Sequence, residues 1–498
     1  MTDTLGTKTL WSATASVVGV LARVTCSILI ARLLGPDGVG RIAYVVWMVE
    51  MTGLVVQLGL GQSLTRYLAE LHGSGRGEEA RALTGWIAVR YAALTVLGAA
   101  AVVSLGPGVA SDRYGPSLWL LAGVLFLAKA LETLYRAELA GQQRFDRLAR
   151  VNTLAGLVWI AGVAFGALRY GVEGALAGHV AGALLPALLG LGLLARRGAR
   201  PGPVLLKRLR RHAIFTWLAA ILSAFVWARM ELLFLERYWD AHEVAMFSVG
   251  LTLASVVTMG PTLLGAALMP HFAGLSGGAD SASIRTAYAT ATRLMAFLLF
   301  PACLGAAAIV PALLPLLYGP GFEPAIPNAM VLVAFSSLAF SGVASSLVYG
   351  LDRPHFVALS GFVGALAAVP LFLLVVPAHG AWGAAWVRSG LQVALVSWGL
   401  FYVARKLRCG APVRALARTA AASVVCGAAA WASVRLVPGP ASILAAVPVG
   451  ALVYVLSVRL LGVLHPEDER ELQRLAARLR PRLRRPASGL IAWLGGAR

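Results

Sequence analysis

The first long apolar segment carries a stripe of small and polar residues that includes one cation. The stripe recurs at intervals of three and four residues: Thr9, Ser12, Ser16, Gly19, Arg23 and Ser27. On a helix such residues share one face, which either lines a cavity or packs closely on another helix. Close packing explains the serines and the glycine, but an ionised arginine near mid-bilayer costs at least about 2.5–3.5 kcal/mol. We therefore expect Arg23 to face water or an opposite charge.

Four other cations fall inside apolar segments and could join Arg23 in binding an anion: Arg90, Lys129, Arg229 and Arg388. Arginine binds phosphate oxygens in a bidentate fork and stays charged at any working pH, so an anionic pyrophosphate suits such a set. The alternative is pairing inside the protein, and the candidate pairs are Lys129 with Glu132, Glu132 with Arg136, and Arg229 with Glu231 or Glu236. For Arg90 and Arg388 the residue pattern does not distinguish anion binding from pairing inside the protein.

The second apolar segment places Glu50, Gly53 and Gln57 on one helical face. Glu50 could bind a proton or Na⁺ during coupled transport. It could instead neutralise Arg23 on the adjacent helix, and this pairing is the favoured interpretation. His179 lies alone among glycine and alanine residues, a setting typical of a hydrogen-bonded interior histidine.

Composition indicates an all-α, polytopic membrane protein. Of 498 residues, 59% are hydrophobic and 13% charged, the mean hydropathy is +0.77, and apolar runs of about 20 residues recur. We expect about fourteen spans, near 10–33, 41–63, 83–106, 116–137, 151–168, 172–195, 212–235, 244–268, 291–316, 325–350, 355–377, 380–404, 416–437 and 440–463. The net charge of +21 gathers in the connections between spans, so we expect no nucleic-acid partner.

Basic connections alternate with weakly charged ones, which predicts cytoplasmic termini in the inner membrane and an even number of spans. The predicted organisation is two pseudo-symmetric six-helix lobes, 1–200 and 212–404, separated by a basic linker at 201–211. The linker is expected to contain a short amphipathic helix on the inner leaflet. An extra helix pair at 405–464 and a basic amphipathic tail at 465–498 follow. The tail carries Leu472, Leu475, Leu479 and Leu483 on one stripe, which suits either a surface helix on anionic lipid or a solvated basic tail.

An internal repeat supports the two lobes. In the first hairpin, the turn Gly35-Pro36-Asp37-Gly38 cannot continue a helix. Placing Val39 on Val244 brings Glu50 onto Ser255 and Gln57 onto Thr262, so the polar stripes coincide. In this alignment Arg229 falls one residue from the position that matches Arg23, which suggests one cation per lobe.

These features resemble a known family. The first hairpin contains ARLLGPDGVGRIAYV and LGLGQSLTRYLAE, and its repeat ends in PHFAGLSGG. With two lobes of six spans plus two, the chain resembles the polysaccharide transporter branch of the multidrug, oligosaccharidyl-lipid and polysaccharide exporter superfamily. The resemblance covers the organisation of the first twelve spans. It implies a flippase that moves a polyprenyl-pyrophosphate oligosaccharide across the cytoplasmic membrane by alternating access, for surface polysaccharide biosynthesis.

The resemblance also implies partners and a role for the extra helix pair. The expected partners are the lipid-linked glycan, membrane lipids of the anionic inner leaflet and glycan-assembly enzymes of the same pathway. In such flippases the extra pair is associated with a groove for the carrier lipid. A pair that only stabilises the second lobe is the alternative, because no residue motif in this segment decides.

Two other functions stay open. The first is a cation-coupled multidrug exporter of the same superfamily. The exporters that such a chain would resemble usually share an acidic residue on the first span, whereas the segment from Leu10 to Ala31 contains none. A membrane-embedded glycan polymerase or ligase needs a substantial outer loop, and the largest outer connections offer only Asp112, Arg113 and Glu323. The chain has no phosphate-binding Gly-Lys-Ser/Thr loop, and its four cysteines are scattered. We therefore expect a transporter, not an enzyme, with no cofactor and no metal.

Overall fold

The computed structural model describes residues 5–109, 114–194, 200–227, 229–265, 268–276, 281–437, 439, 441–477 and 481–496. These residues form helices and connections, with no strand among them, which confirms the predicted all-α class. Asp112, Arg113, Gly278 and Leu479, which entered the sequence predictions, lie outside the described residues.

Within the described residues, ten helical segments are long and apolar enough to cross a membrane, so the chain is a multi-pass membrane protein. Three of them are interrupted by a glycine in the left-handed conformation, which glycine adopts without a steric penalty. These are α1 (Leu5–Val56) at Gly35, α5 (Phe145–Leu194) at Gly171 and α13 (Pro354–Lys406) at Gly380, with φ of 68°, 62° and 53°. Each interruption falls where the sequence predicts a connection between two spans. The number fourteen stays a prediction.

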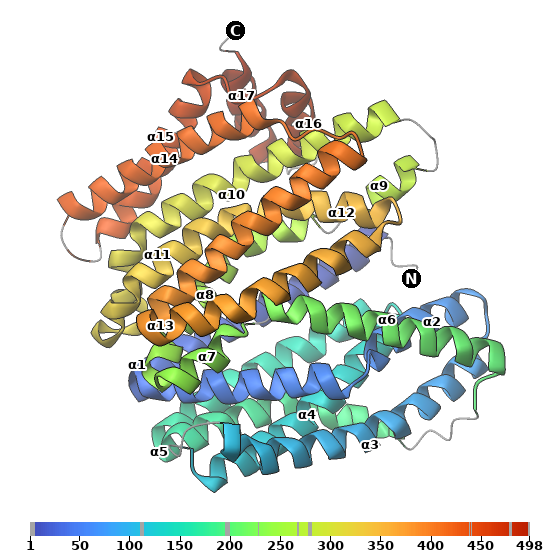
Figure 1. The fold of residues 1–498 in the computed structure, drawn as a ribbon. Helices are drawn as coiled ribbons and strands as arrows, with labels where there is room; N and C mark the ends of the chain where they lie inside the picture. Colours follow the sequence, from blue (N-terminus) through green and yellow to red (C-terminus); the bar gives the residue numbers. More distant parts are fainter. Residues whose placement is uncertain are drawn as a thin grey trace. The chain divides into compact units, whose positions relative to one another are not determined.

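The first of two compact units comprises residues 1–248 and Phe372–Ala381. It contains α1, α5 and α2 (Leu60–Gly73), α3 (Gly77–Val109), α4 (Pro116–Gly141), α6 (Pro203–Trp227), α7 (Glu231–Tyr238) and the start of α8 (Ala241–Gly265). Figure 1 shows the ribbon of α1 turning back at its glycine and continuing toward α2. The core of this unit contains buried Leu64, Leu83, Tyr91 and Leu134.

Glycines close the two arms of α5 onto each other. A Cβ atom added at Gly166 would lie 2.0 Å from the carbonyl oxygen of Gly174, and the reverse distance is also 2.0 Å. One turn further along, a Cβ at Gly178 would lie 2.4 Å from the backbone nitrogen of Val163. Small residues repeated at this spacing let helix backbones approach closely inside a membrane. The sequence therefore specifies a helical hairpin about Gly171.

The second unit comprises residues 249–371 and 382–498. Its elements include α9 (Leu268–Ser276), α10 (Ser281–Tyr318), α11 (Ile326–Phe335), α12 (Gly342–Gly350), α14 (Val413–Leu436), α15 (Ala441–Leu460), α16 (Pro466–Ala477) and α17 (Pro481–Gly495). Short 3₁₀ helices, η1 (Pro320–Ala325) and η2 (Ser336–Ser341), flank α11. The predicted span 325–350 is therefore interrupted by η2 at its middle. Buried Phe272, Leu299, Phe340 and Val403 form the core.

The order of elements repeats along the chain as the sequence predicts. The arm of α1 after Gly35 is followed by a break and the short helix α2, and α8 is followed by the short helix α9. A long helix comes next in both cases, α3 or α10. Later in each copy a helix is divided at a glycine, Gly171 in α5 and Gly380 in α13. This common succession supports a duplicated unit.

The predicted linker is different in the structure. Residues 203–211 are the first turns of α6, which starts at Pro203 and runs on to Trp227. Leu206 and Leu209 are buried, with 7% and 2% of their surfaces exposed, and Leu209 joins the core of the first unit. The apolar face that suggested a helix on the inner leaflet thus packs on protein. The first unit accordingly continues beyond this segment to residue 248.

The tail is also different. The basic amphipathic tail predicted at 465–498 contains two helices, α16 and α17, drawn side by side at the C-terminal end of the chain in Figure 1. Gln473 of α16 donates a hydrogen bond to the Ser488 carbonyl at 3.1 Å. Arg459 of α15 donates to the Trp493 carbonyl at 2.8 Å and lies 4.1 Å from the indole centroid. Leu494 is buried, so this part of the tail is docked on α15.

Candidate substrate site

Arg23 lies on the exposed face of the first arm of α1. An adjacent face of the same helix packs on α5, where Ala22 is 3.4 Å from the position of a Cβ on Gly156, and both Ala22 and Cys26 are buried. Ser16 and Arg23 are exposed, and a Cβ at Gly19 would meet no atom within 4 Å. Close helix packing therefore does not account for this part of the stripe. No hydrogen bond or ion pair involves Arg23 among the residues that the structure describes. The favoured pairing of Glu50 with Arg23 was therefore wrong.

The face predicted for Glu50, Gly53 and Gln57 is divided in the structure. Glu50 is exposed, whereas Gly53 is buried, and a Cβ on it would lie 3.8 Å from the ring of Phe126. The helix α1 ends at Val56, so Gln57 belongs to the turn that follows, and its amide group lies beside Gly53. The Gln57 backbone N–H still donates to the Gly53 carbonyl at 3.0 Å, so Gln57 stays beside Gly53 directly after the end of the helix.

The break after Val56 is held by α6. Leu58 and Gly59 have φ of 49° and 68°, and a Cβ on Gly59 would lie 2.5 Å from the carbonyl oxygen of Ala213. Trp217 donates its indole N–H to the Val55 carbonyl at 3.0 Å, which satisfies an acceptor freed by the break. Sequence reasoning missed this feature.

A second contact between α2 and α6 lies further along these helices. The Arg208 guanidinium donates to both carboxylate oxygens of Glu70, at 2.8 and 3.0 Å. These hydrogen bonds hold the pKa of Glu70 below its ordinary value. The pair is exposed, so its contribution to stability is small.

Lys129 is paired within its own helix. Its Nζ lies 3.4 Å from Glu132, and an Arg136 guanidinium nitrogen lies 2.5 Å from the other oxygen of the same carboxylate. The Glu132 side chain is 7% exposed, whereas the two cations are 39% and 42% exposed. The Lys129–Glu132 and Glu132–Arg136 pairs, which the sequence offered as the alternative, are therefore present.

Arg90 and Arg388 have different surroundings. Arg90 is exposed on α3, lies 3.7 Å from the ring centroid of Trp86 and donates to the Trp86 carbonyl at 3.0 Å. Arg388 is half-buried in α13, within the second unit, and interacts with its surroundings. The predicted cations are thus divided between the two units, with Arg388 in the second and the other four in the first.

The sequence predicted that Arg229 lies within the continuous span 212–235. This prediction was wrong, because α6 ends at Trp227 and α7 starts at Glu231. The φ of Arg229 is 60°, an uncommon conformation for a residue with a side chain. Its carbonyl accepts a hydrogen bond from the backbone N–H of Leu232 at 3.1 Å. The side chain is half-buried and interacts with its surroundings.

Two buried acidic residues next to this break belong to a polar centre. The sequence analysis considered these residues only as partners for Arg229. Glu231 and Glu236 are 2% and 3% exposed. Tyr114 donates its hydroxyl hydrogen to Glu236 at 2.9 Å, and the Tyr44 ring lies 5.8 Å from the Tyr114 ring. The sequence signal for this centre is the presence of two acidic residues within an apolar stretch. The contact with Tyr44 and Tyr114 could not be predicted from spacing, because these tyrosines are far from Glu236 in the sequence.

His179 is an interior residue, as its surroundings in the sequence indicated. Its Nδ1 lies 2.9 Å from the Ala175 carbonyl oxygen, and its ring lies 5.2 Å from that of Trp159. Within the described part of the chain, no group of three His, Cys, Asp or Glu residues could hold a metal ion.

The extra helix pair is packed tightly at its glycines. A Cβ on Gly427 of α14 would lie 3.2 Å from the Leu304 carbonyl of α10. A Cβ on Gly450 of α15 would lie 3.4 Å from Ala430 and 3.5 Å from the sulfur of Cys426. These glycines therefore face neighbouring helices and do not line an open groove. Exposed apolar residues such as Leu444 and Leu452 point away from this packing.

Comparisons with solved structures identify the fold. The chain superimposes on the lipid II flippase MurJ in an inward closed conformation with a TM-score of 0.72 and 12% identity, over 91% of this chain and 98% of that one. For an inward-facing multidrug resistance transporter of the MATE family, within the MOP superfamily, the TM-score is 0.63 at 15% identity, over 78% and 95% of the chains.

A third similar structure is a MOP superfamily transporter from Pyrococcus furiosus, described as having a binding pocket of reverse polarity. Its TM-score is 0.54 at 17% identity, over 80% of this chain and 95% of that one. No curated protein sequence matches the chain significantly. The fold is thus that of MOP superfamily transporters, as the sequence predicted.

A family model gives the classification. The model described as a polysaccharide biosynthesis protein matches residues 29–327, which is more than half of the chain. The matched range starts in the first arm of α1 and extends into α11, so it includes the first hairpin and its repeat. The chain therefore belongs to this polysaccharide biosynthesis protein family.

Proposed function

We propose that this protein is a flippase that carries an anionic, lipid-linked oligosaccharide across the cytoplasmic membrane. Arg23 carries the proposal. It is an exposed arginine on an apolar helix, without an ion pair among the described residues, and a cation in that position needs water or an anionic guest. A pyrophosphate linking lipid and sugar would supply the anion.

Two similarities support an anionic cargo. The fold similarity to a lipid II flippase extends over 91% of the chain, and the family is named for polysaccharide biosynthesis. The transporter from Pyrococcus furiosus is described by the reversed polarity of its binding pocket and by a different function that this polarity suggests. We infer that Arg23 gives the present chain a cationic site in place of an acidic one.

The other predicted cations have unequal parts in this proposal. Lys129 shares the carboxylate of Glu132 with Arg136, so its charge is already offset. Arg90, Arg229 and Arg388 remain proposed contacts for the cargo. The two lobes would rock between inward and outward openings, with both termini cytoplasmic and glycan-assembly enzymes supplying the substrate.

A cation-coupled drug exporter is the second candidate. It is favoured by the similarity to the MATE family transporter and by the exposed carboxylate of Glu50. The two functions differ in the sign of the cargo, since an exporter of cationic drugs has no need of Arg23.

Substitution of Arg23 tests the flippase proposal. Arg23→Ala should reduce transport of a pyrophosphate-linked oligosaccharide in liposomes at least tenfold, because the anion loses its fixed counter-charge. Arg23→Lys should restore part of the rate if charge matters more than the bidentate fork. Arg169→Ala is the control, because Arg169 is an exposed cation of the same unit beside the turn at Gly171. Normal transport by Arg23→Ala would remove this residue from the site.

A further inference from the structure

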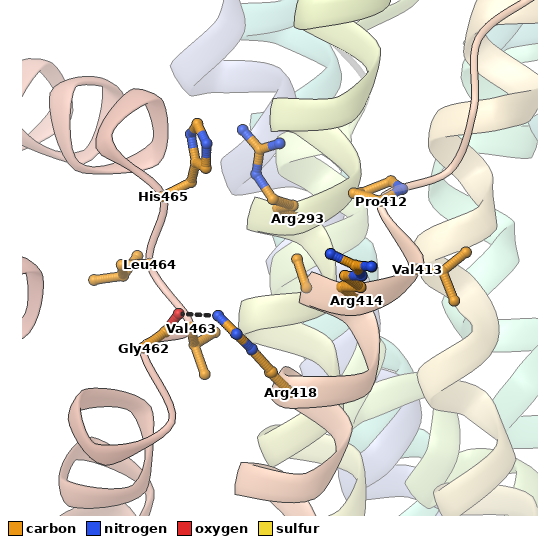
Figure 2. A pocket seen from close by; sticks show the side chains of 10 residues that line it. Arg293, Pro412, Val413, Arg414, Arg418, Gly462, Val463, Leu464 and His465 are labelled. Carbon is orange, nitrogen blue, oxygen red and sulfur yellow. Dashed lines mark hydrogen bonds between the residues drawn. The ribbon is translucent and has the colours of Figure 1, made fainter. Parts of the chain in front are cut away.

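We propose that a cationic pocket in the second unit binds a phosphate group at the edge of the membrane. The pocket has a volume of about 460 Å³ and is lined by α10, by the start of α14 and by the segment that follows α15. Figure 2 shows Arg418 extending from α14 to Gly462 of this segment; Arg414 of α14 and Arg293 of α10 also line the pocket. None of these residues belongs to the proposed transport site, so the inference goes beyond the proposed function.

The position of the pocket along the helices gives its depth in the membrane. Arg414 and Arg418 lie in the first turns of α14, and Gly462 to His465 come just after the end of α15 at Leu460. Both helices are candidate membrane spans. The pocket therefore lies where two spans meet the water, which is the level of lipid phosphate groups. Basic pockets between helices at this level attract anionic head groups.

A buried ion pair gives the pocket a fixed wall. The Arg293 Nε donates to Asp468 at 2.8 Å, and another guanidinium nitrogen lies 3.1 Å from Glu467. The Asp468 side chain is 2% exposed and also accepts the backbone N–H of His465 at 3.2 Å. These contacts tie α16 and the segment before it to α10. They also offset the charge of Arg293, so this arginine shapes the pocket and does not supply its net charge.

Arg414 and Arg418 supply the uncompensated charge. Arg418 donates to the Gly462 carbonyl at 3.1 Å, a neutral acceptor that leaves its charge unpaired and its other N–H groups available. Arg414 is exposed, and no partner for it is present among the described residues. The two arginines are four residues apart on α14, so they lie on the same face of the helix. Together they can offer forked donors to one phosphate.

Apolar residues adjoin the two arginines. Val413, next to Arg414, is 69% exposed, and Leu464 also lines the pocket. A phosphate with an attached hydrocarbon chain would use both kinds of surface. A free phosphate would use only the arginines, so the chemistry that the two sources share is a phosphate anion held by Arg414 and Arg418.

Binding measurements on the full-length protein test this proposal. The protein would be titrated with phosphatidylglycerol in phosphatidylcholine nanodiscs, and separately with inorganic phosphate in detergent. The double variant Arg414→Ala/Arg418→Ala should bind phosphatidylglycerol at least tenfold more weakly than the unmodified chain. Arg435→Ala is the matched control, because Arg435 lies at the opposite end of α14, 5.0 Å from the Trp431 ring. This control should bind as the unmodified protein does.

The outcomes separate the sources of the phosphate. Loss of phosphatidylglycerol binding in the double variant, with no response of either protein to inorganic phosphate, supports a lipid head group. Inorganic phosphate that binds the unmodified protein but not the double variant supports a free phosphate. If the alanine variant does not fold, Arg414→Lys/Arg418→Lys retains the charge and should bind with intermediate affinity. Equal binding by the unmodified protein and the variants that fold, or binding of neither ligand, overturns the proposal.

Discussion

Arg23 and Lys129 show how pairing changes the meaning of a cation inside an apolar helix. Both lie in segments that can cross a membrane. Lys129 has a carboxylate within 3.4 Å, whereas no such partner is described for Arg23. A cation without a partner carries a larger penalty in an apolar medium, so it is more informative about a ligand. This difference places Arg23 first among the predicted site residues.

Glu132 is expected to stabilise the first unit through its two cations. Replacing it with glutamine would leave Lys129 and Arg136 without their shared charge, and removing one partner of a buried pair is strongly destabilising. Because both cations are partly exposed, we expect a loss of about 1–2 kcal/mol, which is below the value for fully buried pairs. Thermal unfolding in detergent measures the effect.

A matched variant distinguishes the pair from a general effect of substitution. Lys129→Ala should lower the melting temperature less than Glu132→Gln does, since Arg136 still neutralises the carboxylate at 2.5 Å. Equal melting temperatures for Glu132→Gln and the unmodified protein would show that the carboxylate does not stabilise this helix.

Local spacing made part of this residue chemistry predictable. Lys129, Glu132 and Arg136 are three and four residues apart, so a helix alone brings them together. Glu236 and Tyr114 are separated by 122 positions, and their hydrogen bond depends on how distant helices pack. Arg229 was misplaced because nothing near it in the sequence, neither glycine nor proline, marks the end of α6.

At the scale of elements, the breaks between helices divide into those marked by glycine and those imposed by packing. Gly35, Gly171 and Gly380 are interruptions that the sequence placed correctly, because a left-handed φ favours glycine. The turn at 57–59 was missed, although it contains Gly59. Its first residues are Gln57 and apolar Leu58, which continue the helical pattern, and α6 holds the turn from far along the chain.

Gly59 provides a test of the break that α6 holds. Gly59→Ala would force a side chain into a φ of 68° and place its Cβ 2.5 Å from the Ala213 carbonyl. We expect a loss of stability of about 1–3 kcal/mol from backbone strain, and more if α6 has to shift. The melting temperature of the purified protein measures it.

The control for this substitution lies on the same helix. Gly73 ends α2, and a Cβ there would meet nothing within 4 Å. Gly73→Ala should leave the melting temperature almost unchanged. A comparable fall in both variants would mean that the contact with α6 does not hold the break.

The extra helix pair, α14 and α15, also shows that packing between helices decides what a small residue does. Gly427 and Gly450 are small positions in this pair, at which bulk would obstruct a lipid groove only if they lined one. The structure places both against neighbouring helices, so larger residues there would disturb packing for every cargo. Tight packing favours a stabilising role for these two positions. A groove for a carrier lipid, if the pair provides one, would have to use exposed residues such as Leu444.

At the scale of the whole molecule, the distribution of basic residues predicts topology. Ser74, in the connection after α2, is exposed, and its hydroxyl donates to the Glu70 and Leu71 carbonyls of that helix. Ser74→Cys should therefore react with an impermeant thiol reagent in opened membranes but not in intact cells. The four native cysteines are buried, so they should add little background.

Tyr170→Cys is the opposite control. Tyr170 is 69% exposed beside the turn at Gly171, in a connection that the charge pattern places outside. It should react in intact cells. Labelling of Ser74→Cys in intact cells, together with protection of Tyr170→Cys, would show that the chain has the inverted orientation.

Composition and periodicity were sufficient to predict the membrane architecture, because long apolar runs have few alternatives in a helical protein. The arrangement of the charged residues required tertiary structure. The linker at 201–211 illustrates this limit: its basic, amphipathic pattern suits a membrane surface, yet Leu206 and Leu209 are buried in the first unit. A sequence pattern identifies an apolar face but not what covers it.

The central claim is that the chain moves a lipid-linked, anionic oligosaccharide without altering it. The most direct measurement uses purified protein in liposomes that contain a fluorescent polyprenyl-pyrophosphate oligosaccharide, with an impermeant reagent reporting arrival in the opposite leaflet. We predict rapid arrival with the unmodified protein, at least tenfold slower arrival with Arg23→Ala, and an unchanged mass of the substrate. Arrival no faster than in protein-free liposomes, or conversion to a product of different mass, would contradict the account.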